Sequence, residues 1–377
     1  MNSNCFLEKL KRLGINFYTG VPDSQLKALC DELYATYTLG KEHIVAANEG
    51  AAVGLATGHY LATGKPALVY MQNSGIGNAI NPIASLTNEH VYKIPMVFVI
   101  GWRGEPGVQD EPQHVFQGKI TTALMDVLEI PYYILNPETS ESDLDGYLRE
   151  TEKVLAEEKS VAFIVRKGAF TRAGKVDYSN SNTMTRETAL ETLIKQTGED
   201  EIIVSTTGKL SRELFEIRER LGQGHEHDFL TVGSMGHASM IAMGIALEKP
   251  NRTVWCLDGD GAAVMHMGSM EIVATTGCTN MVHVVFNNGA HETVGGMPVA
   301  YGKTNFHAIA KAMGYKISKS AGSEKEIEQA INEFKLEVGT RFLEIKVANG
   351  ARENLGRPTT TPVENKKILM IRGLLDE

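Results

Sequence analysis

Two polar turns in the second half of the chain carry side chains that suit a divalent cation. Asp260 stands in a Gly-Asp-Gly turn after an apolar run, and Asn288 ends a second apolar run 28 positions later. This spacing leaves room for one helix and one strand, so both side chains should lie at the carboxyl ends of neighbouring parallel strands. Carboxylate and amide oxygens are ligands for Mg²⁺, which also bridges to phosphate oxygens. The pattern therefore predicts a magnesium and phosphate site.

Glu49 is the candidate acid of the first half. It stands between an apolar run and a helix of small residues, 50–64. A buried carboxylate costs several kcal/mol unless it has a partner, and its pKa rises. Such a group can exchange a proton with a ligand near neutral pH. The alternative is a glutamate in the first helical turn that only interacts with the helix dipole.

Polar loops after the predicted strands offer groups for an anionic substrate and for proton transfer. Arg103 is the first candidate, because a guanidinium can hold an oxyanion with two parallel hydrogen bonds. The alternative for Arg103 is an ordinary surface arginine. Asp23 and His114 are of the types that supply or relay a proton. Further candidate donors to the substrate are Ser24, Asn73, Ser74, Asn78, His291 and Lys303.

An α/β scaffold is needed to bring these groups together. Short apolar runs end in glycine-rich turns and pass into amphipathic or small-residue segments, which is typical of parallel sheets covered by helices on both faces. Asp23 and Ser24 are expected to cap the helix that follows them. Strands are expected to begin near residues 15, 43, 66, 95 and 161 in the first half, and near 201, 253, 280 and 341 in the second.

The polar segment 171–185 divides the chain into two halves of similar size. It is rich in small and polar residues, and a new series of strands and helices starts after it. We therefore expect two domains, residues 1–178 and 179–377. The alternative is a long surface loop within one domain.

Composition excludes several classes of protein. The 377 residues are 42% hydrophobic and 22% charged, which argues against disorder, and the net charge of −9 makes the chain a poor general ligand for nucleic acid or anionic membranes. The longest apolar run, 94–102, is too short for a membrane helix. Charged residues near the N-terminus argue against a secretory signal. The four scattered cysteines indicate inert thiols in a reducing cytoplasm.

The Gly-Asp-Gly turn followed after about thirty residues by Asn-Asn resembles the cofactor motif of thiamine-diphosphate enzymes. This resemblance implies two parallel-sheet domains, one binding the pyrimidine of the cofactor and one its diphosphate, without a central third domain. It implies that Asp260, Asn288 and the carbonyl of Ala290 bind Mg²⁺, with Asn287 as the alternative to Asn288. It assigns Glu49 to the pyrimidine ring. Thr207, Gly208, Gly261 and Ala262 would contact the diphosphate, the carbonyl of Gly233 the exocyclic amine, and Met235 the underside of the cofactor.

Longer phrases narrow the resemblance to the phosphonopyruvate and sulfopyruvate decarboxylases. They include GVPDS (20–24), NEGAAVGLATGHYLATGK (48–65) and NNGAHETVGG (287–296), although Glu292 and Met297 depart from the expected HDSVGGQP. The resemblance implies decarboxylation of 3-phosphonopyruvate to phosphonoacetaldehyde and CO₂ in phosphonate biosynthesis, with thiamine diphosphate and Mg²⁺. It also implies a homo-oligomer, at least a dimer, with the cofactor between subunits. The alternatives are a sulfopyruvate decarboxylase giving sulfoacetaldehyde, a carboligase, and a non-catalytic phosphate-binding protein.

Overall fold

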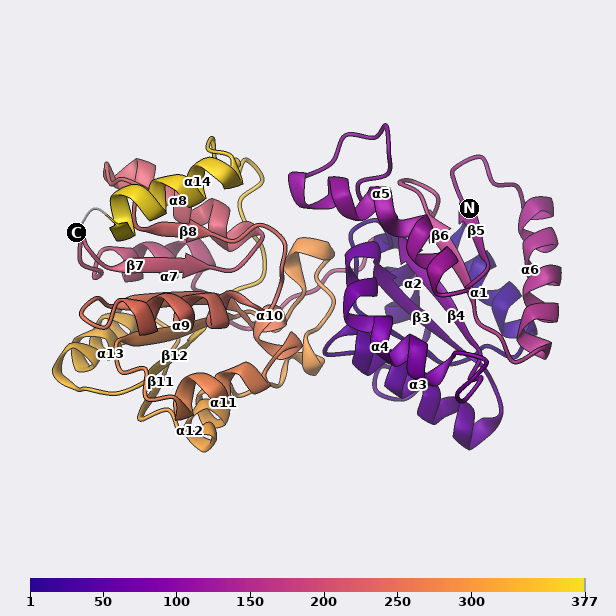
Figure 1. Cartoon of the computed structure of the whole chain (residues 1–377), viewed down its shortest axis with the longest axis horizontal. Helices are drawn as coiled ribbons and strands as arrows, with labels where there is room; N and C mark the ends of the chain where they lie inside the picture. The colour runs from indigo at the N-terminus through magenta and orange to yellow at the C-terminus, as the bar shows by residue number, and fades with distance from the viewer. Residues whose placement is uncertain (376–377) are drawn as a thin grey trace. The chain divides into compact units, whose positions relative to one another are not determined.

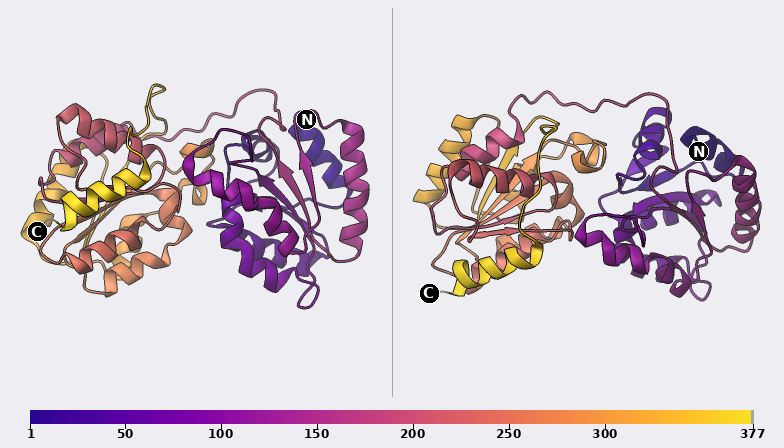
Figure 2. Two further views of the ribbon diagram at one scale, coloured as in Figure 1. Left: turned by 45° about the horizontal axis from the view of Figure 1, so that its top comes forward. Right: turned by 90° about the horizontal axis from the view of Figure 1, so that it is seen from above.

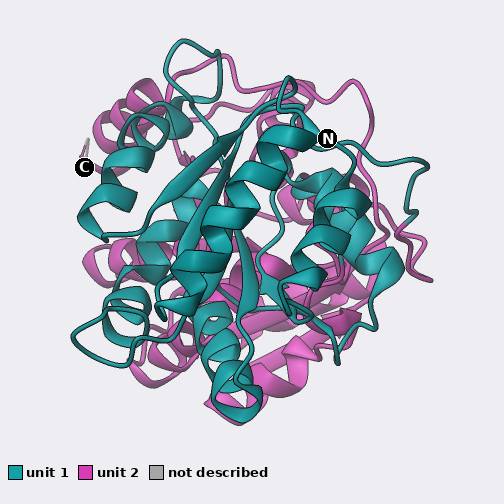
Figure 3. Ribbon diagram, turned by 90° about the vertical axis from the view of Figure 1, so that its right-hand side faces the viewer, with its two compact units in different colours: residues 1–177, 294–297 teal, residues 178–293, 298–377 magenta. Residues whose placement is uncertain are grey.

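Two six-stranded sheets, each entirely parallel, form the framework of the protein (Figure 1). The computed structural model describes residues 1–375. Contacts divide the chain into two compact units, shown in separate colours in Figure 3. Unit 1 comprises Met1–Asp177 with the short segment Val294–Met297, and unit 2 comprises Tyr178–Thr293 and the chain from Pro298 onward.

The sheet of unit 1 has the strand order β2-β1-β3-β4-β6-β5. Its inner strands are buried almost throughout, which a parallel sheet covered on both faces requires. The strands are β1 (Tyr18–Gly20), β2 (His43–Val45), β3 (Ala67–Gln72), β4 (Met96–Gly101), β5 (Tyr132–Leu135) and β6 (Val161–Val165). The helices are α1 (Ser3–Arg12), α2 (Lys27–Thr36), α3 (Glu49–Thr63), α4 (Ile76–Leu86), α5 (Pro112–Val127) and α6 (Glu141–Ala156).

The sheet of unit 2 has the order β11-β12-β10-β9-β7-β8. Its strands are β7 (Ile202–Ser205), β8 (Asp228–Leu230), β9 (Val254–Gly259), β10 (Met281–Asn287), β11 (Ile317–Ala321) and β12 (Arg341–Lys346). The helices are α7 (Arg186–Ile194), α8 (Lys209–Leu221), α9 (Ala238–Glu248), α10 (Asp260–Met265), α11 (Gly268–Thr275), α12 (Phe306–Met313), α13 (Glu324–Leu336) and α14 (Pro362–Ile368).

In each sheet the strand order reverses after the first two strands. In unit 1 the chain moves from β1 outward to β2 and then returns to β3 on the other side of β1. In unit 2 it moves from β7 outward to β8 and returns to β9. Sheets of this kind bind ligands at the carboxyl ends of the strands on either side of such a point. The fold therefore directs attention to the loops after β1 and β3, and after β7 and β9.

The C-terminal helix covers the edge of the second sheet. α14 lies beside β8, the last strand of the sheet, and Figure 2 shows this helix from two further sides. The side chain of Asn365 is buried and bonds the strand twice: Oδ1 accepts from the Leu230 N–H at 3.0 Å, and Nδ2 donates to the Asp228 carbonyl at 2.8 Å. These bonds take the place of part of a neighbouring strand.

The structure corrects some local predictions. The helix α2 begins at Lys27 and its N-cap is Leu26, so Asp23 and Ser24 do not cap it. Asp23 instead accepts a hydrogen bond from the Gln25 N–H at 3.0 Å in a turn ahead of the helix. Strands β5, β8 and β11 were not expected. Within residues 1–375, no helix is both long enough and apolar enough to cross a bilayer.

Candidate active site

The candidate residues of unit 2 follow the carboxyl ends of four adjacent strands. Thr207 and Gly208 come after β7, Gly233 and Met235 after β8, Asp260 after β9 and Asn288 after β10. Hydrogen bonds join these loops directly: the Gly233 N–H donates to Thr207 Oγ1 at 3.0 Å, and the Gly289 N–H donates to Asp260 Oδ2 at 2.6 Å. The fold therefore brings the predicted residues of unit 2 into one place.

Asp260 is a buried carboxylate held by backbone amides. Besides Gly289, the N–H of Gly261 donates to its Oδ1 at 2.7 Å. Burial raises the pKa of Asp260 to about 7, although these amides and those of Asn288 and Ala290 pull it down. Among the described residues, the hydrogen-bond partners of this carboxylate are backbone amides and include no cation. It therefore fits a divalent metal, which would supply the missing positive charge.

The two asparagines after β10 have different surroundings. Asn287 donates to Glu344 Oε1 at 2.7 Å and to the Thr304 carbonyl at 3.2 Å. Asn288 donates to Glu292 Oε2 at 2.7 Å, and its Oδ1 accepts from the Ala290 N–H at 3.0 Å. The amide nitrogen of Asn287 thus faces β12, and that of Asn288 faces the turn that follows. Both amide oxygens retain a lone pair for a cation.

His291 and Met235 lie against Gly261. A Cβ added at Gly261 would lie 3.0 Å from His291 Nδ1 and 3.4 Å from Met235 Cε. Ala262, the next residue of α10, is buried as well. Burial lowers the pKa of His291 to about 4, so its imidazole is neutral at physiological pH and can donate only one N–H. Asp260, Gly261, Ala262, Met235 and His291 thus belong to one cluster.

Glu49 is the first residue of α3 and has a specific polar partner. Asn78 Nδ2 donates to its Oε2 at 2.8 Å, so Asn78, expected among the substrate donors, contacts this acid. Burial raises the pKa of Glu49, while the bond from Asn78 opposes the shift. A Cβ at Gly75 would lie 2.3 Å from Glu49 Oε1, so only glycine leaves space for the carboxylate. The side chain is therefore a buried acid in a fitted position rather than an exposed first-turn glutamate.

Asp23 lies at the reversal point of the first sheet. Gln72, the last residue of β3, donates to Asp23 Oδ1 at 2.6 Å. A Cβ at Gly101 would lie 2.3 Å from Asp23 Oδ2, so glycine is required there too. Burial raises the pKa of Asp23, against the opposing effects of Gln72 and Arg103. Asp23 is thus a second buried acid of unit 1.

Arg103 is engaged by a carboxylate that the sequence analysis did not single out. Its Nε donates to Asp110 Oδ2 at 2.7 Å, Nη2 donates to Asp110 Oδ1, and Nη1 donates to Ser24 Oγ at 2.9 Å. The hydrogen bond to Asp110 raises the pKa of Arg103. His114, on α5, is buried, and both burial and the charge of Arg103 lower its pKa. Its Nδ1 has no hydrogen-bond partner among the described residues.

Asn73 and Ser74 follow β3 and support the neighbouring loops. Asn73 Nδ2 donates to the Arg103 carbonyl at 2.8 Å and to Thr121 Oγ1 at 2.9 Å. Ser74 Oγ donates to Gln72 Oε1 at 2.6 Å. Together with Asp23, Ser24 and Arg103 they form one polar network over the ends of β1, β3 and β4. Lys303, in contrast, is exposed.

Sequence reasoning missed several residues that hold the candidates. Gln72 and Asp110 position Asp23 and Arg103, and a network of Arg186, Lys209 and Glu213 holds Glu292. Asp110 had a readable signal, because it is an acid seven positions after an arginine in a loop containing glycine and proline. The partners of Glu292 come from distant parts of the sequence and carried no such signal.

Cys256, Asp258 and His283 form a second group of potential metal ligands, with their ligand atoms within 4.8 Å of one another. His283 Nδ1 forms a hydrogen bond with the Tyr315 hydroxyl at 3.0 Å, and His283 Nε2 lies 3.6 Å from Asp258 Oδ2. Burial raises the pKa of the Cys256 thiol well above its usual value, so in the absence of a metal the thiol stays protonated. We interpret the group as a buried polar contact within the sheet.

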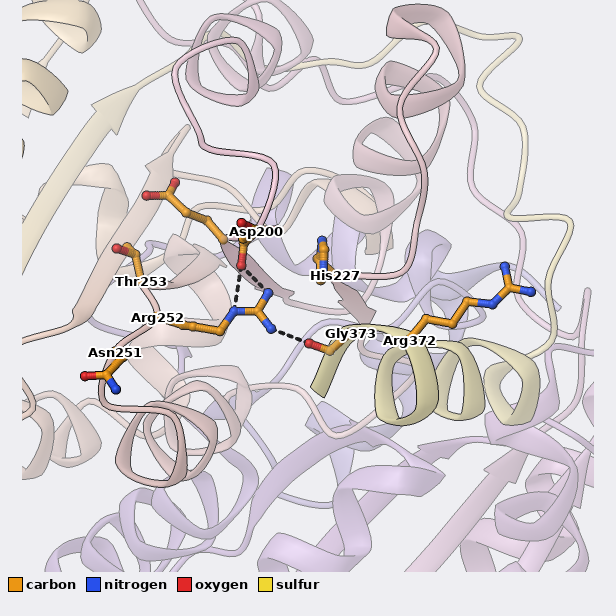
Figure 4. Close-up of a pocket in the computed structure, with 8 residues that line it drawn as sticks. Asp200, His227, Asn251, Arg252, Thr253, Arg372 and Gly373 are labelled. Atoms are coloured by element: carbon orange, nitrogen blue, oxygen red, sulfur yellow. Dashed lines mark hydrogen bonds between the residues drawn. The ribbon is translucent and has the colours of Figure 1, made fainter. Parts of the chain in front are cut away.

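A cavity of about 550 Å³ lies at the amino ends of strands β7, β8 and β9, whereas the candidate residues follow the carboxyl ends (Figure 4). Arg252 extends across it and donates to the carbonyls of Asp200 and Gly373. This guanidinium connects the C-terminal segment to the loop before β7. Its backbone partners indicate a structural tether rather than a ligand site.

Comparison with known proteins matches two family models to the two halves of the chain. The N-terminal binding domain of thiamine pyrophosphate (thiamine diphosphate) enzymes matches residues 3–126, and the C-terminal binding domain matches residues 206–345. The chain is 31% identical to a phosphonopyruvate decarboxylase of Streptomyces viridochromogenes, over 94% of this chain and 90% of the relative. It is 32% identical to that of Streptomyces hygroscopicus, over 97% and 92%.

A sulfopyruvate decarboxylase of Methanosarcina acetivorans is 24% identical, over 91% of this chain and 90% of that protein. Both parallel-sheet units and the full-length matches thus agree with the resemblance noted in the sequence. The chain belongs to the thiamine-diphosphate-dependent decarboxylases, in the family that includes the phosphonopyruvate decarboxylases.

Proposed function

We propose that this protein decarboxylates 3-phosphonopyruvate to phosphonoacetaldehyde and CO₂, with thiamine diphosphate and Mg²⁺, as a step of phosphonate biosynthesis. The observation that carries the choice of substrate is the identity of 31–32% to two phosphonopyruvate decarboxylases, against 24% to a sulfopyruvate decarboxylase. We also propose a cytoplasmic location, with which the four free cysteines agree.

In this proposal the loops of unit 2 hold the diphosphate and the metal. Asp260, Asn288 and the carbonyl of Ala290 supply three oxygen ligands of the kind that Mg²⁺ prefers. Thr207, Gly208, Gly261 and Ala262 contact the diphosphate, and the N-terminus of α10 favours its negative charge. The Gly233 carbonyl and the Met235 side chain contact the rest of the cofactor.

Thiamine diphosphate, when bound, supplies an electron sink for the pair released as CO₂ leaves. The chain supplies proton handling and orientation. Glu49 would share a proton with the pyrimidine nitrogen through one carboxylate oxygen, for which a buried carboxyl with a raised pKa is suited. Asp23 and His114 supply or relay the proton that replaces the lost carboxylate. Both side chains are buried in unit 1, and the positive charge of Arg103 acts to lower the pKa of each.

The substrate's phosphonate requires N–H and O–H donors. We propose that Ser24, Ser74, Arg103 and His291 provide them. Asn73, whose amide nitrogen donates to the Arg103 carbonyl and to Thr121, would contribute by holding the loop of Arg103. The Nη1 group of Arg103, beside Ser24, remains available to donate to the phosphonate. Asp110 holds the rest of the guanidinium in a defined orientation. A preoriented donor loses less freedom on binding than a mobile surface arginine.

Steady-state rates with a panel of 2-oxo acids test this function. The holoenzyme, reconstituted with thiamine diphosphate and Mg²⁺, should show its highest kcat/KM with phosphonopyruvate, compared with sulfopyruvate and pyruvate. A higher value with sulfopyruvate would overturn the substrate assignment. Activity without thiamine diphosphate or without a divalent metal would overturn the cofactor assignment. Product analysis with an added aldehyde acceptor would reveal a carboligase.

We further propose an obligate homo-oligomer in which Glu49 of one copy and Asp260 of another serve the same cofactor. Mixing two inactive variants, Glu49→Gln and Asp260→Asn, after dissociation tests this arrangement. Shared sites should restore up to about a quarter of the wild-type activity, since half of randomly mixed dimers carry one intact site of two. If both groups came from one copy, every site would keep one mutation and the mixture would stay inactive.

A further inference from the structure

Glu292 is the residue through which the Asn288 side chain is connected to the body of unit 2. The Asn288 amide nitrogen donates to Glu292 Oε2 at 2.7 Å, while its amide oxygen accepts the Ala290 N–H at 3.0 Å. A side-chain amide can be turned over with little change in shape. The carboxylate of Glu292 can only accept a hydrogen bond, so it selects the orientation in which the nitrogen faces it and the oxygen faces away.

Glu292 itself has a fixed position. Arg186 Nη1 donates to its Oε2 at 3.0 Å, Lys209 Nζ donates to Oε1 at 3.2 Å, and the Gly350 N–H donates to Oε2 at 3.3 Å. Its side chain is only 10% exposed. These partners come from α7, the start of α8 and the loop after β12, so the carboxylate connects three separate segments to the turn after β10.

Arg186 is in turn held by a second carboxylate. It bonds Glu213 with both Nε, at 2.7 Å, and Nη2, at 2.8 Å, and both side chains are buried. The four groups Glu213, Arg186, Glu292 and Lys209 carry two negative and two positive charges. The network is therefore neutral and adds no net charge beside Asp260. Its contribution to a cation site is geometric.

We propose that Glu292 is a positioning residue, which holds Asn288 so that its amide oxygen remains directed to the metal. The inference rests on the proposed function of Asp260 and Asn288 as Mg²⁺ ligands. Residues that orient a metal ligand commonly change metal affinity by 10–100-fold when they are replaced. The glutamate, where the related sequences led us to expect aspartate, reaches Arg186, Lys209 and Asn288 at once. The methylene that glutamate has beyond aspartate carries the carboxylate into these contacts.

The test compares Glu292→Gln with Glu213→Gln as a matched control. Both variants remove one negative charge from Arg186, but only Glu292 contacts Asn288. The readout is the Kd of Mg²⁺ in the presence of saturating thiamine diphosphate, followed by intrinsic fluorescence without substrate. We expect Glu292→Gln to weaken Mg²⁺ binding by about 10–100-fold. Both carboxylate oxygens accept hydrogen bonds, so the amide nitrogen of glutamine would face donors at either position and disturb the contact that holds Asn288. Glu213→Gln should change the Kd by less than about threefold, because the carboxylate–Asn288 contact is intact.

Thermal unfolding of both apo variants measures the cost of disturbing Arg186, which should be similar. Equal loss of Mg²⁺ affinity in both variants, or an unchanged Kd in Glu292→Gln, would overturn the inference. If Glu292→Gln does not fold, Glu292→Asp keeps the charge but draws it back by one methylene, and it should also weaken Mg²⁺ binding. Asp260→Asn separates the two proposals: if it too leaves Mg²⁺ binding unchanged, the proposed metal site fails, whereas an effect of Asp260→Asn alone refutes only the role of Glu292.

Discussion

The backbone N–H of Gly289 donates a 2.6 Å hydrogen bond to Asp260 Oδ2, across two neighbouring strands of the second sheet. The residues are 29 positions apart in the sequence, yet the parallel register of β9 and β10 ends both strands at the same edge. One carboxylate thereby holds the turn that carries Asn288. Asp260 has a structural contact and a proposed ligand role at the same time, which a substitution can separate.

Asp260→Asn tests the ligand role. Asparagine keeps the size but only one acceptor oxygen, so it can accept from only one of the two backbone N–H groups of Gly261 and Gly289. The negative charge that a divalent cation needs is lost. We expect Mg²⁺-dependent retention of thiamine diphosphate to disappear. Loss of the buried charge stabilises the apo protein, and loss of one backbone hydrogen bond destabilises it, so the two effects on apo stability oppose each other. Cofactor remaining after gel filtration measures the first effect. Normal retention in this variant would contradict the assignment.

Gly75→Ala tests the fitted position of Glu49. The new Cβ would lie 2.3 Å from Glu49 Oε1, so the carboxylate must move. Displacement of a catalytic group by about 1 Å can lower the rate about a hundredfold, and we expect a fall in kcat of that order. Gly77→Ala is the matched control, because its Cβ would meet nothing within 4 Å. Equal rates in the two variants would show that the position of Glu49 does not depend on Gly75.

Glu49→Gln removes the proton that the carboxyl is proposed to share. Glutamine can still accept the bond from Asn78, so the side chain should keep its place. We expect kcat to fall by about 10²–10⁴-fold, which is the usual contribution of a general acid or base. The cofactor affinity should change little. Pre-steady-state mixing with substrate and a cofactor-binding titration measure the two quantities, and full activity would refute the role.

The same substitution changes how stability depends on pH. Burial raises the pKa of Glu49 above its ordinary value of 4.5, so above that pH the unfolded chain releases a proton that the folded chain retains. The free energy of unfolding of the wild-type apo protein therefore falls as pH rises above 4.5, and levels off above the folded-state pKa. Glu49→Gln lacks this pH dependence. Its Tm relative to wild type should be higher at pH 8 than at pH 4.5, and an unchanged difference would contradict the raised pKa.

The strands and their loops were readable from the sequence wherever apolar runs were long and ended in glycine. The runs before Asp260, Asn288 and Arg103 are of this kind, and each became a buried central strand. β8 and β11 escaped detection because they are at the edges of their sheet, where fewer apolar residues are needed. β5 is likewise an edge strand, and three of its four residues are only partly buried.

The candidate site was predictable as a set of residues but not as a set of contacts. Asp260 and Glu49 stood out because carboxylates are rare beside buried runs. The pairing of Arg103 with Asp110, and of Glu49 with Asn78, depends on loop and helix geometry that local sequence does not define. The position of Glu292 depends on Arg186, which is 106 residues away in the chain. Such long-range polar contacts carry no periodic signal.

Asn365→Ala tests whether the C-terminal helix stabilises the edge of the second sheet. The substitution would leave the Leu230 N–H and the Asp228 carbonyl without their side-chain partner in a buried position. Each unsatisfied buried group costs about 1–3 kcal/mol, so for the two groups we expect a loss of about 2–6 kcal/mol in the free energy of unfolding. Urea denaturation measures it, with the exposed neighbour Lys366→Ala as the control. β8 leads into the loop of Gly233 and Met235, so cofactor affinity should fall as well. A stability equal to that of the control would show that the two hydrogen bonds are replaced by water.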